Sequence, residues 1–181
     1  MPDIIFSSII RDLKAALTTR DHSFRYFTLA TTDNYGIPKI RTMVLRGADN
    51  NLNITIYTDK RSSKISHIAK QDRVSLLFFD PERLVQVSIQ AKAKIEEDDQ
   101  TLKNIWENIP QKSKKDYTTK FAPGSEIQKP EAVDYLENKH YFSAITFVPE
   151  SIEYLRLKKP NHMRVLFKKK NSNWNGNYLV P

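Results

Sequence analysis

The chain contains no cysteine, which excludes disulfide bonds and metal sites built on thiolates. It also lacks an apolar run long enough to cross a membrane, and residues 1–20 do not have the basic-then-apolar layout of a secretion signal. From these absences we expect a soluble protein of the cytoplasm, the compartment in which chains without disulfides are most common.

Glycine and histidine are scarce as well. The four glycines are expected in turns or loops, and none of them forms a Walker phosphate loop or a dinucleotide-binding fingerprint. The four histidines share no metal-ligand spacing, so we expect no metal site. No serine stands in a nucleophile elbow, which leaves covalent catalysis unsupported. A phosphate group would therefore have to be held by side chains and a helix N-terminus.

Positive charge is in excess, with a net charge of +8 and a pI of about 9.5. One interpretation is a protein that binds nucleic acid or a membrane surface, and another is a site for a phosphorylated small molecule. The densest basic cluster, residues 168–170, lies at the end of a predicted strand, where lysines commonly serve solubility. Aromatic residues are not interleaved with it in a stacking pattern, which argues against nucleic acid.

The periodicity of apolar residues predicts the elements. Residues 3–19 have the stripe of an amphipathic helix, which Asp3 could cap, within an N-terminal region of residues 1–20. Alternation predicts strands over 25–32, 39–46 and 52–58, the first two joined by a turn at 33–36. Ser62 or Ser63 is expected to cap a short helix that runs to residue 71. Residues 74–79 predict a strand buried on both faces, and residues 84–95 a strand with one polar face.

The second half of the chain begins with a helical, loop-rich insertion at residues 98–139, which includes a short helix at 130–138. Four more strands are predicted at residues 142–148, 151–158, 163–169 and 174–180. About eight or nine mostly antiparallel strands with flanking helices indicate a mainly β fold, a β-barrel with a helical insertion. Nothing divides the chain, so residues 1–181 are expected to form a single domain.

The stretch of residues 41–64 carries the most specific chemistry. Arg41 alternates into a row of apolar residues, which suggests a partly buried charge with a partner, although a strand end reaching solvent would look the same. A second strand then leads into the turn Ser62-Ser63-Lys64, which opens a helix. Free backbone N–H groups, hydroxyls and cationic side chains in one place are what a phosphate monoester requires.

Short motifs also follow one another in a characteristic order. They are Arg41-Thr42-Met43-Val44-Leu45-Arg46, Tyr57-Thr58, Ser62-Ser63-Lys64, Gln86-Val87, Ala91-Lys92-Ala93, Trp106, Ile109-Pro110 and Ala122-Pro123-Gly124, with closing strands after residue 147. This order resembles the pyridoxamine 5′-phosphate oxidase family over residues 25–181, and its oxidase-related FMN-binding branch more than the oxidase itself. The resemblance implies an FMN-binding split barrel that works as a homodimer, with FMN in two clefts at the subunit interface.

The resemblance also implies roles by matching position. The residues implied to hold the FMN phosphate are Arg41, Ser62, Ser63 and Lys64. The groups implied to pack along the ribityl chain and ring are Arg46, Tyr57, Thr58 and the backbone of Met43, Val44 and Leu45. Gln86 would hydrogen-bond the isoalloxazine edge, and Arg164 would reach in from the second subunit.

Some positions depart from the oxidase pattern. Its substrate-binding Arg-Leu-His segment is Pro160-Asn161-His162-Met163 here, and its flavin-stacking Trp is Leu155. The second Arg of its phosphate turn is Ser63, with Arg61 as a candidate replacement. We therefore expect an FMN-dependent oxidoreductase whose substrate and catalytic residues the sequence does not identify. The alternatives are a genuine pyridoxamine or pyridoxine 5′-phosphate oxidase, a basic β-barrel that binds nucleic acid without FMN, and a barrel that binds haem.

Overall fold

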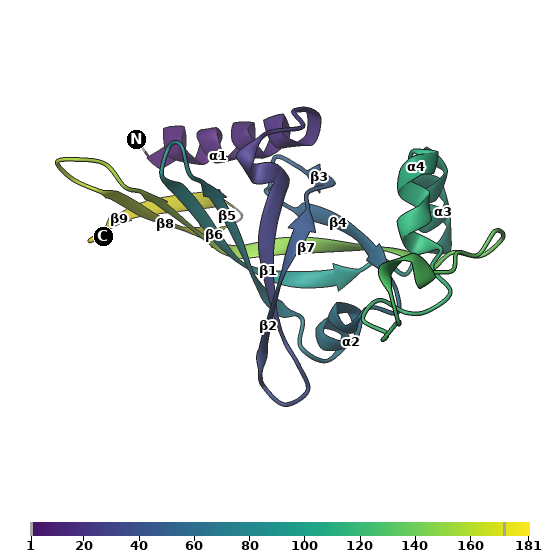
Figure 1. Ribbon diagram of the computed structural model, residues 1–181. Helices are drawn as coiled ribbons and strands as arrows, with labels where there is room; N and C mark the ends of the chain where they lie inside the picture. The colour runs from purple at the N-terminus through teal and green to yellow at the C-terminus, as the bar shows by residue number, and fades with distance from the viewer. Residues whose placement is uncertain (1, 172) are drawn as a thin grey trace.

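The computed structural model describes residues 2–171 and 173–181. Its strands are β1 (Tyr26–Thr32), β2 (Pro38–Val44), β3 (Gly47–Ala48), β4 (Ile54–Asp59), β5 (Arg73–Asp80), β6 (Val85–Ile95), β7 (Phe142–Arg156), β8 (Met163–Lys170) and β9 (Asn173–Leu179). Its helices are α1 (Pro2–Thr18), α2 (Ser63–Lys70), α3 (Asp99–Asn108) and α4 (Gln111–Lys114), with 3₁₀ turns η1 (Ser23–Arg25), η2 (Lys115–Tyr117) and η3 (Pro130–Ala132). These strands form one curled sheet in the order β2-β1-β5-β6-β7-β4-β3, with β8 and β9 continuing from β7 (Figure 1).

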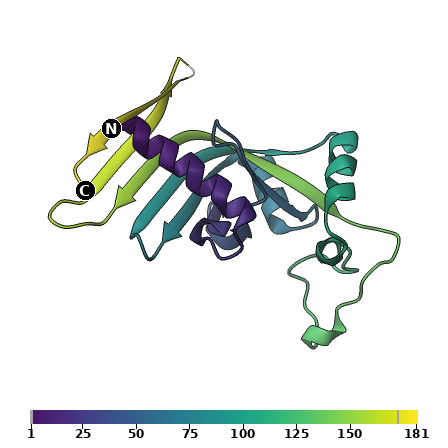
Figure 2. The same ribbon diagram turned by 90° about the horizontal axis from the view of Figure 1, so that it is seen from above.

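The core lies between α1 and the inner face of the sheet. Helix α1 crosses above the strands (Figure 2) and buries the apolar stripe that includes Ile9 and Leu13. Below it, Leu29, Leu76 and Ile89 of three neighbouring strands stand side by side in the ladder and are 0% exposed. Inward-facing apolar residues alternate with polar ones along β6, as predicted, because successive side chains of a strand point to opposite faces. The mainly β, split-barrel architecture is thus confirmed.

Strand β7 replaces two of the predicted strands. Residues 142–147 pair with β4 and residues 151–156 pair with β8, while β6 runs along the other edge of β7. Pro149, which follows the predicted strand 142–148, lies where β7 changes partners, and β7 has a bulge there because Ser151 pairs with Gln90 and Pro149 with Ala91, which leaves Glu150 unpaired. A proline is tolerated at such a place because no ladder bond from its nitrogen is required.

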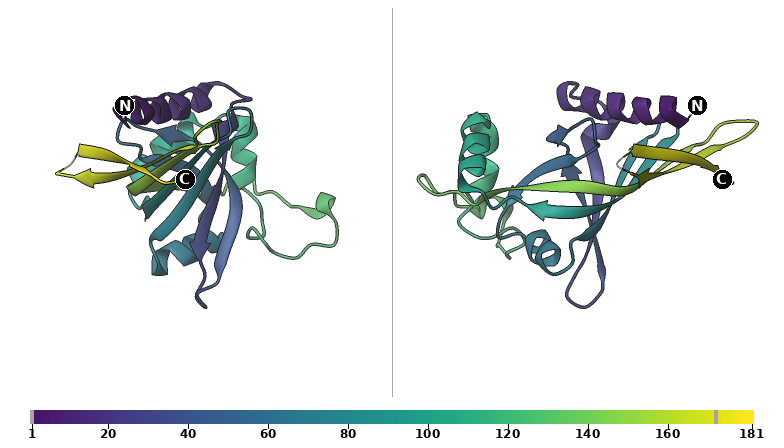
Figure 3. Two further views of the ribbon diagram at one scale, coloured as in Figure 1. Left: turned by 90° about the vertical axis from the view of Figure 1, so that its left-hand side faces the viewer. Right: turned by 180° about the vertical axis from the view of Figure 1, so that it is seen from behind.

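The outer face of the sheet is less buried than predicted. Strand β5 was expected to be covered on both sides, yet Leu77 is 36% and Phe79 47% exposed. Helix α1 covers only the inner face, and the two side views in Figure 3 show no element layered over the outer one. Apolar side chains therefore remain uncovered on this broad surface.

The helical insertion packs as a second, smaller cluster at one end of the sheet. Ile109, Tyr117, Phe142 and Ala144 are buried together there, beside Trp106 of α3. Residues 130–138 form only the short turn η3 and a single bridge from Thr119 to Tyr135, so the predicted helix is wrong. No helix in the described part of the chain is long and apolar enough to cross a bilayer.

Two glycines lie in strands and not in turns, contrary to our expectation. Gly47 begins β3, and Gly176 lies in the middle of β9. A Cβ on Gly176 would come within 2.6 Å of the Phe167 ring and 2.7 Å of Pro2 Cβ. Strand β9 needs a glycine here because β8 and the start of α1 approach its backbone closely.

Candidate functional site

A cluster of polar side chains lies where β4 ends and α2 begins. Thr58 points to the same face of β4 as the buried Ile54 and Ile56, and Ser62 stands at the N-cap position of α2. Lys64 of the first turn of α2 directs its Nζ back to Thr58 Oγ1 at 2.9 Å and to Ser62 Oγ at 3.1 Å. The Ser62 hydroxyl lies 3.2 Å from that of Thr58 and does not cap the helix, so the first backbone N–H groups remain available.

Arg41 joins this cluster from β2. Its Nη1 donates to Thr31 Oγ1 at 2.6 Å, and Thr31 in turn lies 3.0 Å from His67 Nδ1 on the buried side of α2. Arg41 therefore points toward the predicted turn and not into solvent. We call Thr31, Arg41, Thr58, Ser62, Lys64 and His67 the basic corner.

The basic corner holds positive charge at an energetic cost. Burial, and after it the nearby Arg41, lower the pKa of Lys64 to about 8, although Asp59 opposes both effects. Burial likewise lowers the pKa of Arg41, and burial and then Arg41 lower that of His67, which keeps its imidazole neutral at pH 7. Within the described residues, neither Lys64 nor Arg41 forms a salt bridge. Both cations therefore lie partly buried without a carboxylate that compensates their charge.

Arg61 does not take the place of the family's second arginine. Its guanidinium binds the Asp59 carboxylate at 2.7 Å and the carbonyl oxygens of residues 119–121, and it lies 3.3 Å from the centre of the Tyr141 ring. Arg61 thus ties the insertion to the turn and is not available to a ligand at the basic corner.

Ser63 lies beside this corner on α2, and Met43, Val44 and Leu45 follow Arg41 along the end of β2 and just after it. Ser63 is exposed as the first residue of α2. Met43 packs on the core opposite Phe27, Leu45 is buried, and Val44 faces the other side opposite Tyr26. Because β2 pairs only with β1, half of its backbone N–H and C=O groups point away from the sheet and are open to a ligand.

On the other face of β4, a cavity of about 630 Å³ opens between Tyr57 and helix α3. Arg25 and Arg46 are among its lining residues, and the Cζ of Arg46 is 5.9 Å from the centre of the Tyr57 ring. Burial raises the pKa of Tyr57 and of Tyr117, so both phenols stay protonated at neutral pH. We call this the α3 cavity.

Gln86 and Arg164 lie elsewhere, on the outer face of the sheet. In the ladder Gln86 stands opposite Leu155, and Leu155 opposite Arg164, so the three form one row. Arg164 Nη2 donates to Glu153 Oε2 at 3.1 Å, whereas its Nε is buried without a partner in the described chain. Arg41 stands opposite Leu29 in the ladder, and Leu29 faces the core, so Arg41 and the basic corner lie on the inner face of the sheet. The row that contains Gln86 and Arg164 therefore lies on the opposite face.

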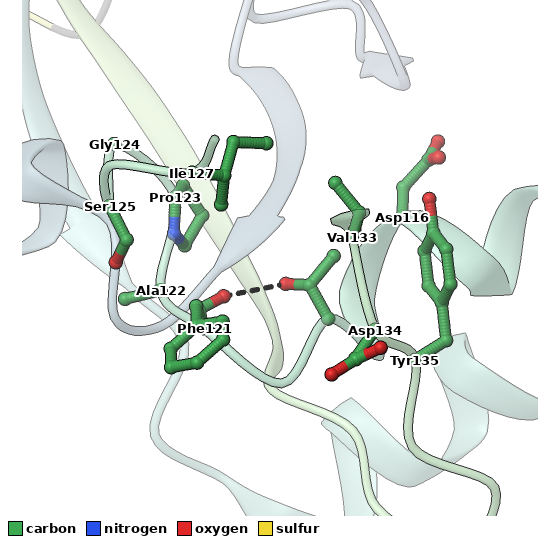
Figure 4. Close-up of a pocket in the computed structure, with 11 residues that line it drawn as sticks. Asp116, Phe121, Ala122, Pro123, Gly124, Ser125, Ile127, Val133, Asp134 and Tyr135 are labelled. Carbon is green, nitrogen blue, oxygen red and sulfur yellow. Dashed lines mark hydrogen bonds between the residues drawn. The ribbon is translucent and has the colours of Figure 1, made fainter. Parts of the chain in front are cut away.

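A second concave surface of about 390 Å³ lies in the insertion between residues 116 and 135 (Figure 4). Phe121, Ile127 and Val133 contribute apolar side chains, and Asp116 and Asp134 stand at its edge. None of the predicted site residues lines it.

Sequence reasoning missed Thr31 and His67. Neither belongs to a motif, and only the hydrogen-bonded chain from Arg41 through Thr31 to His67 reveals them. Among the described residues, no group of three or more His, Asp or Glu side chains could hold a metal ion.

The comparisons with known proteins converge on one family. Residues 7–97 match the family model described as the pyridoxamine 5′-phosphate oxidase FMN-binding domain. A pyridoxamine 5′-phosphate oxidase-related, FMN-binding protein of Nostoc punctiforme is similar in structure, with a TM-score of 0.78 and 21% identity over 97% of this chain and 96% of its own.

Two further solved structures have the same fold. PhzG of Burkholderia lata, in complex with tetrahydrophenazine-1-carboxylic acid, gives a TM-score of 0.77 with 17% identity over 99% of this chain and 92% of its own. A pyridoxamine 5′-phosphate oxidase homologue of Listeria innocua gives a TM-score of 0.56 with 21% identity, over 82% of this chain and 95% of its own. At these identities the structural likeness establishes the fold.

Proposed function

Because this chain belongs to the pyridoxamine 5′-phosphate oxidase FMN-binding domain family, we propose that it binds FMN, with the phosphate in the basic corner. The observation that carries this proposal is the pair of partly buried cations, Arg41 and Lys64, which have no carboxylate partner in the described chain. A dianionic ester compensates both charges and reverses the burial effect that lowers the pKa of Lys64.

The other groups of the basic corner suit the same ligand. Thr58 and Ser62 offer hydroxyl hydrogens, and the N-terminus of α2 offers the backbone N–H groups of Ser63 and Lys64 with the positive end of the helix dipole. Arg41 supplies the planar guanidinium that binds phosphate oxygens in pairs. Bound FMN would supply two-electron redox chemistry, while the chain supplies position and charge.

We further propose that the protein works as a homodimer in which each FMN contacts both subunits. Gln86 and Arg164 share one row on the outer face and cannot turn toward the basic corner of their own chain. A second copy that lays its outer face against this corner would bring both residues to the isoalloxazine. The orphaned Nε of Arg164 and the uncovered apolar side chains of that face support this arrangement.

The activity proposed is that of an FMN-dependent oxidoreductase. Arg46 and Tyr57, two residues expected to contact the ribityl chain and ring, line the α3 cavity, which is therefore the candidate place for a substrate. PhzG, which shares the fold, is a relative seen with a small organic acid. An oxygen-consumption assay with pyridoxamine 5′-phosphate separates the proposed activity from that of the oxidase itself.

The test is flavin binding by the purified protein and its Arg41→Ala variant. The wild type should titrate with FMN, change the flavin absorption spectrum and retain FMN on gel filtration. Arg41→Ala should weaken FMN binding at least tenfold, since a hydrogen bond to a charged group is worth about 1.5–3 kcal/mol. Arg11→Ala, at an exposed position of α1, is the matched control. A wild-type protein that ignores added FMN contradicts the proposal.

A further inference from the structure

The hydrogen bonds that hold Arg41 in the basic corner have a definite direction. A guanidinium can only donate, so Thr31 Oγ1 accepts from Arg41 Nη1 at 2.6 Å. Within the described residues, the other partner of this hydroxyl is His67 Nδ1, at 3.0 Å. Thr31 is 2% exposed, so its own hydrogen needs an acceptor inside the protein, and the imidazole nitrogen is placed to be that acceptor. Arg41 therefore donates to Thr31, and Thr31 donates to His67.

This direction specifies the form of His67. Its Nδ1 must carry no proton in order to accept, which leaves a neutral ring with its hydrogen on Nε2. A hydrogen on Nδ1 would give Thr31 Oγ1 two donors and leave the buried hydroxyl hydrogen without an acceptor. Burial, and after it the charge of Arg41, lower the pKa of His67. Asp33 opposes these effects and Lys39 adds to them, and the ring is neutral at pH 7.

Helix α2 thus contacts both cations of the basic corner. Lys64 and His67 stand three residues apart, so they share one face of the helix. Lys64 bonds directly to the hydroxyls of the turn, whereas His67 holds Arg41 through Thr31. One hydrogen-bonded chain therefore joins α2 to β1 and β2 and ends at the guanidinium.

We propose that Thr31 and His67 are positioning residues for the flavin phosphate, because they hold the Arg41 guanidinium in the basic corner before the ligand arrives. The proposal rests on the proposed function and deepens it. Arg41 has a long side chain on a strand at the edge of the sheet, and such a side chain reaches solvent unless a buried acceptor retains it. Holding the guanidinium in advance reduces the entropy lost when the phosphate binds.

The first test needs no flavin. Long-range proton–nitrogen NMR spectra of the flavin-free protein at pH 7 report the tautomer of each histidine, and the His67→Asn variant identifies the signals of His67. The expected form is the neutral ring with its hydrogen on Nε2. An imidazolium, or a hydrogen on Nδ1, would overturn the proposal, because neither form accepts from Thr31.

The second test compares FMN with riboflavin, which lacks the phosphate, by fluorescence titration. Thr31→Val should weaken FMN about tenfold, because Arg41 loses its buried acceptor, and should leave riboflavin affinity unchanged. Thr31→Ser keeps the hydroxyl and should restore most of the FMN affinity. Thr32→Val makes the same chemical change at the next residue of β1, whose side chain points to the other face, and is the matched control.

A double-mutant cycle separates positioning from a purely structural role. In the Arg41→Ala protein, Thr31→Val should change FMN affinity less than about twofold, since Thr31 acts through Arg41. His67→Leu should repeat the loss seen in Thr31→Val. His67→Asn, whose amide oxygen can take the place of Nδ1, should recover part of it. Circular dichroism establishes that each variant is folded.

The outcomes distinguish this proposal from the proposed function. A wild-type protein that ignores FMN overturns the proposed function and, with it, the positioning role. FMN binding that depends on Arg41 but not on Thr31 overturns the positioning role alone. Equal losses of FMN and riboflavin in Thr31→Val, or a full loss that persists beside Arg41→Ala, also overturn it, because Thr31 would then act on the fold.

Discussion

The ammonium group of Lys64 is both partly buried and placed to bind a phosphate. Its ammonium must be desolvated to meet a phosphate beside Thr58 and Ser62, and desolvation together with Arg41 lowers its pKa to about 8. Its charge is therefore lost at a pH where an exposed lysine is still fully protonated. The pH dependence of ligand binding can therefore test whether Lys64 contributes its charge to the basic corner.

We predict that FMN affinity falls as pH rises through about 8, the pKa of Lys64 in the free protein. Below that pH the ammonium is charged and binds the phosphate; above it the neutral amine binds weakly, while Arg41 stays charged. Lys64→Met should weaken FMN at pH 7 by about 10- to 100-fold and abolish this dependence, since a hydrogen bond to a charged group contributes about 1.5–3 kcal/mol. Fluorescence titration from pH 6.5 to 9.5 measures both effects.

Riboflavin, which lacks the phosphate, and Lys70→Met, an exposed lysine of the same helix, are the controls. Riboflavin affinity should not change with Lys64, and Lys70→Met should behave as wild type. An unchanged pH profile in Lys64→Met would show that Lys64 does not bind the phosphate.

At the residue scale the sequence predicted much of the basic corner but not all of it. Arg41, Thr58, Ser62 and Lys64 meet because a strand alternates and a helix begins at fixed positions, which a local pattern reveals. Thr31 of β1 and His67 of α2 belong to no motif, and only the fold joins them to Arg41. Arg61 was misassigned because its partners, Asp59 and the residues 119–121, include a loop far along the chain.

At the scale of elements, the docking of β8 and β9 onto α1 depends on close packing. Phe6 of α1 lies 5.5 Å from Phe167 and 5.7 Å from Trp174 between ring centroids, and Gly176 lets β9 approach Phe167. The sequence located these strands, but it assigned Gly176 to a turn. A glycine that avoids a clash with another element leaves no local signal.

Gly176→Ala should lower the free energy of unfolding by about 1–3 kcal/mol, because the added methyl group overlaps the Phe167 ring and Pro2. Urea denaturation followed by tryptophan fluorescence measures the change. The neighbouring exposed Asn175→Ala should have little effect. A Gly176→Ala protein as stable as wild type would mean that α1 and β8 shift without cost.

Strand β7 was also predicted incompletely. Its two halves have separate partners, β4 and β8, and Pro149 lies between them. Proline is a sound strand terminator in isolation, but here the chain continues in the same direction because the bulge of β7 at Glu150 accommodates it. The choice between two short strands and one long strand depends on neighbours that are distant in sequence.

At the scale of the whole molecule, the uncovered outer face is the surface through which we propose that two copies associate. Phe79 is 47% exposed and stands opposite Gln86 in the ladder. Phe79→Glu should convert a dimer to a monomer and weaken FMN retention, because a charge is costly to bury in an apolar interface. Light scattering after gel filtration measures the mass.

Ile4→Glu, which also adds a charge at an exposed apolar residue but lies on α1, is the control and should leave the mass unchanged. A wild-type protein that is monomeric at micromolar concentration and still binds FMN would contradict the shared site.

The separation of Arg41 and Lys64 from Gln86 and Arg164 on opposite sheet faces has a genetic consequence, intersubunit complementation. Lys64→Met and Arg164→Met should each lose flavin when produced alone. Coexpressed with different tags, they should recover flavin at about one quarter of all sites, since random pairing gives half mixed molecules, each with one wild-type pocket. Recovery confined to doubly tagged molecules would demonstrate that each flavin is held by two chains, whereas no recovery would indicate that one chain suffices.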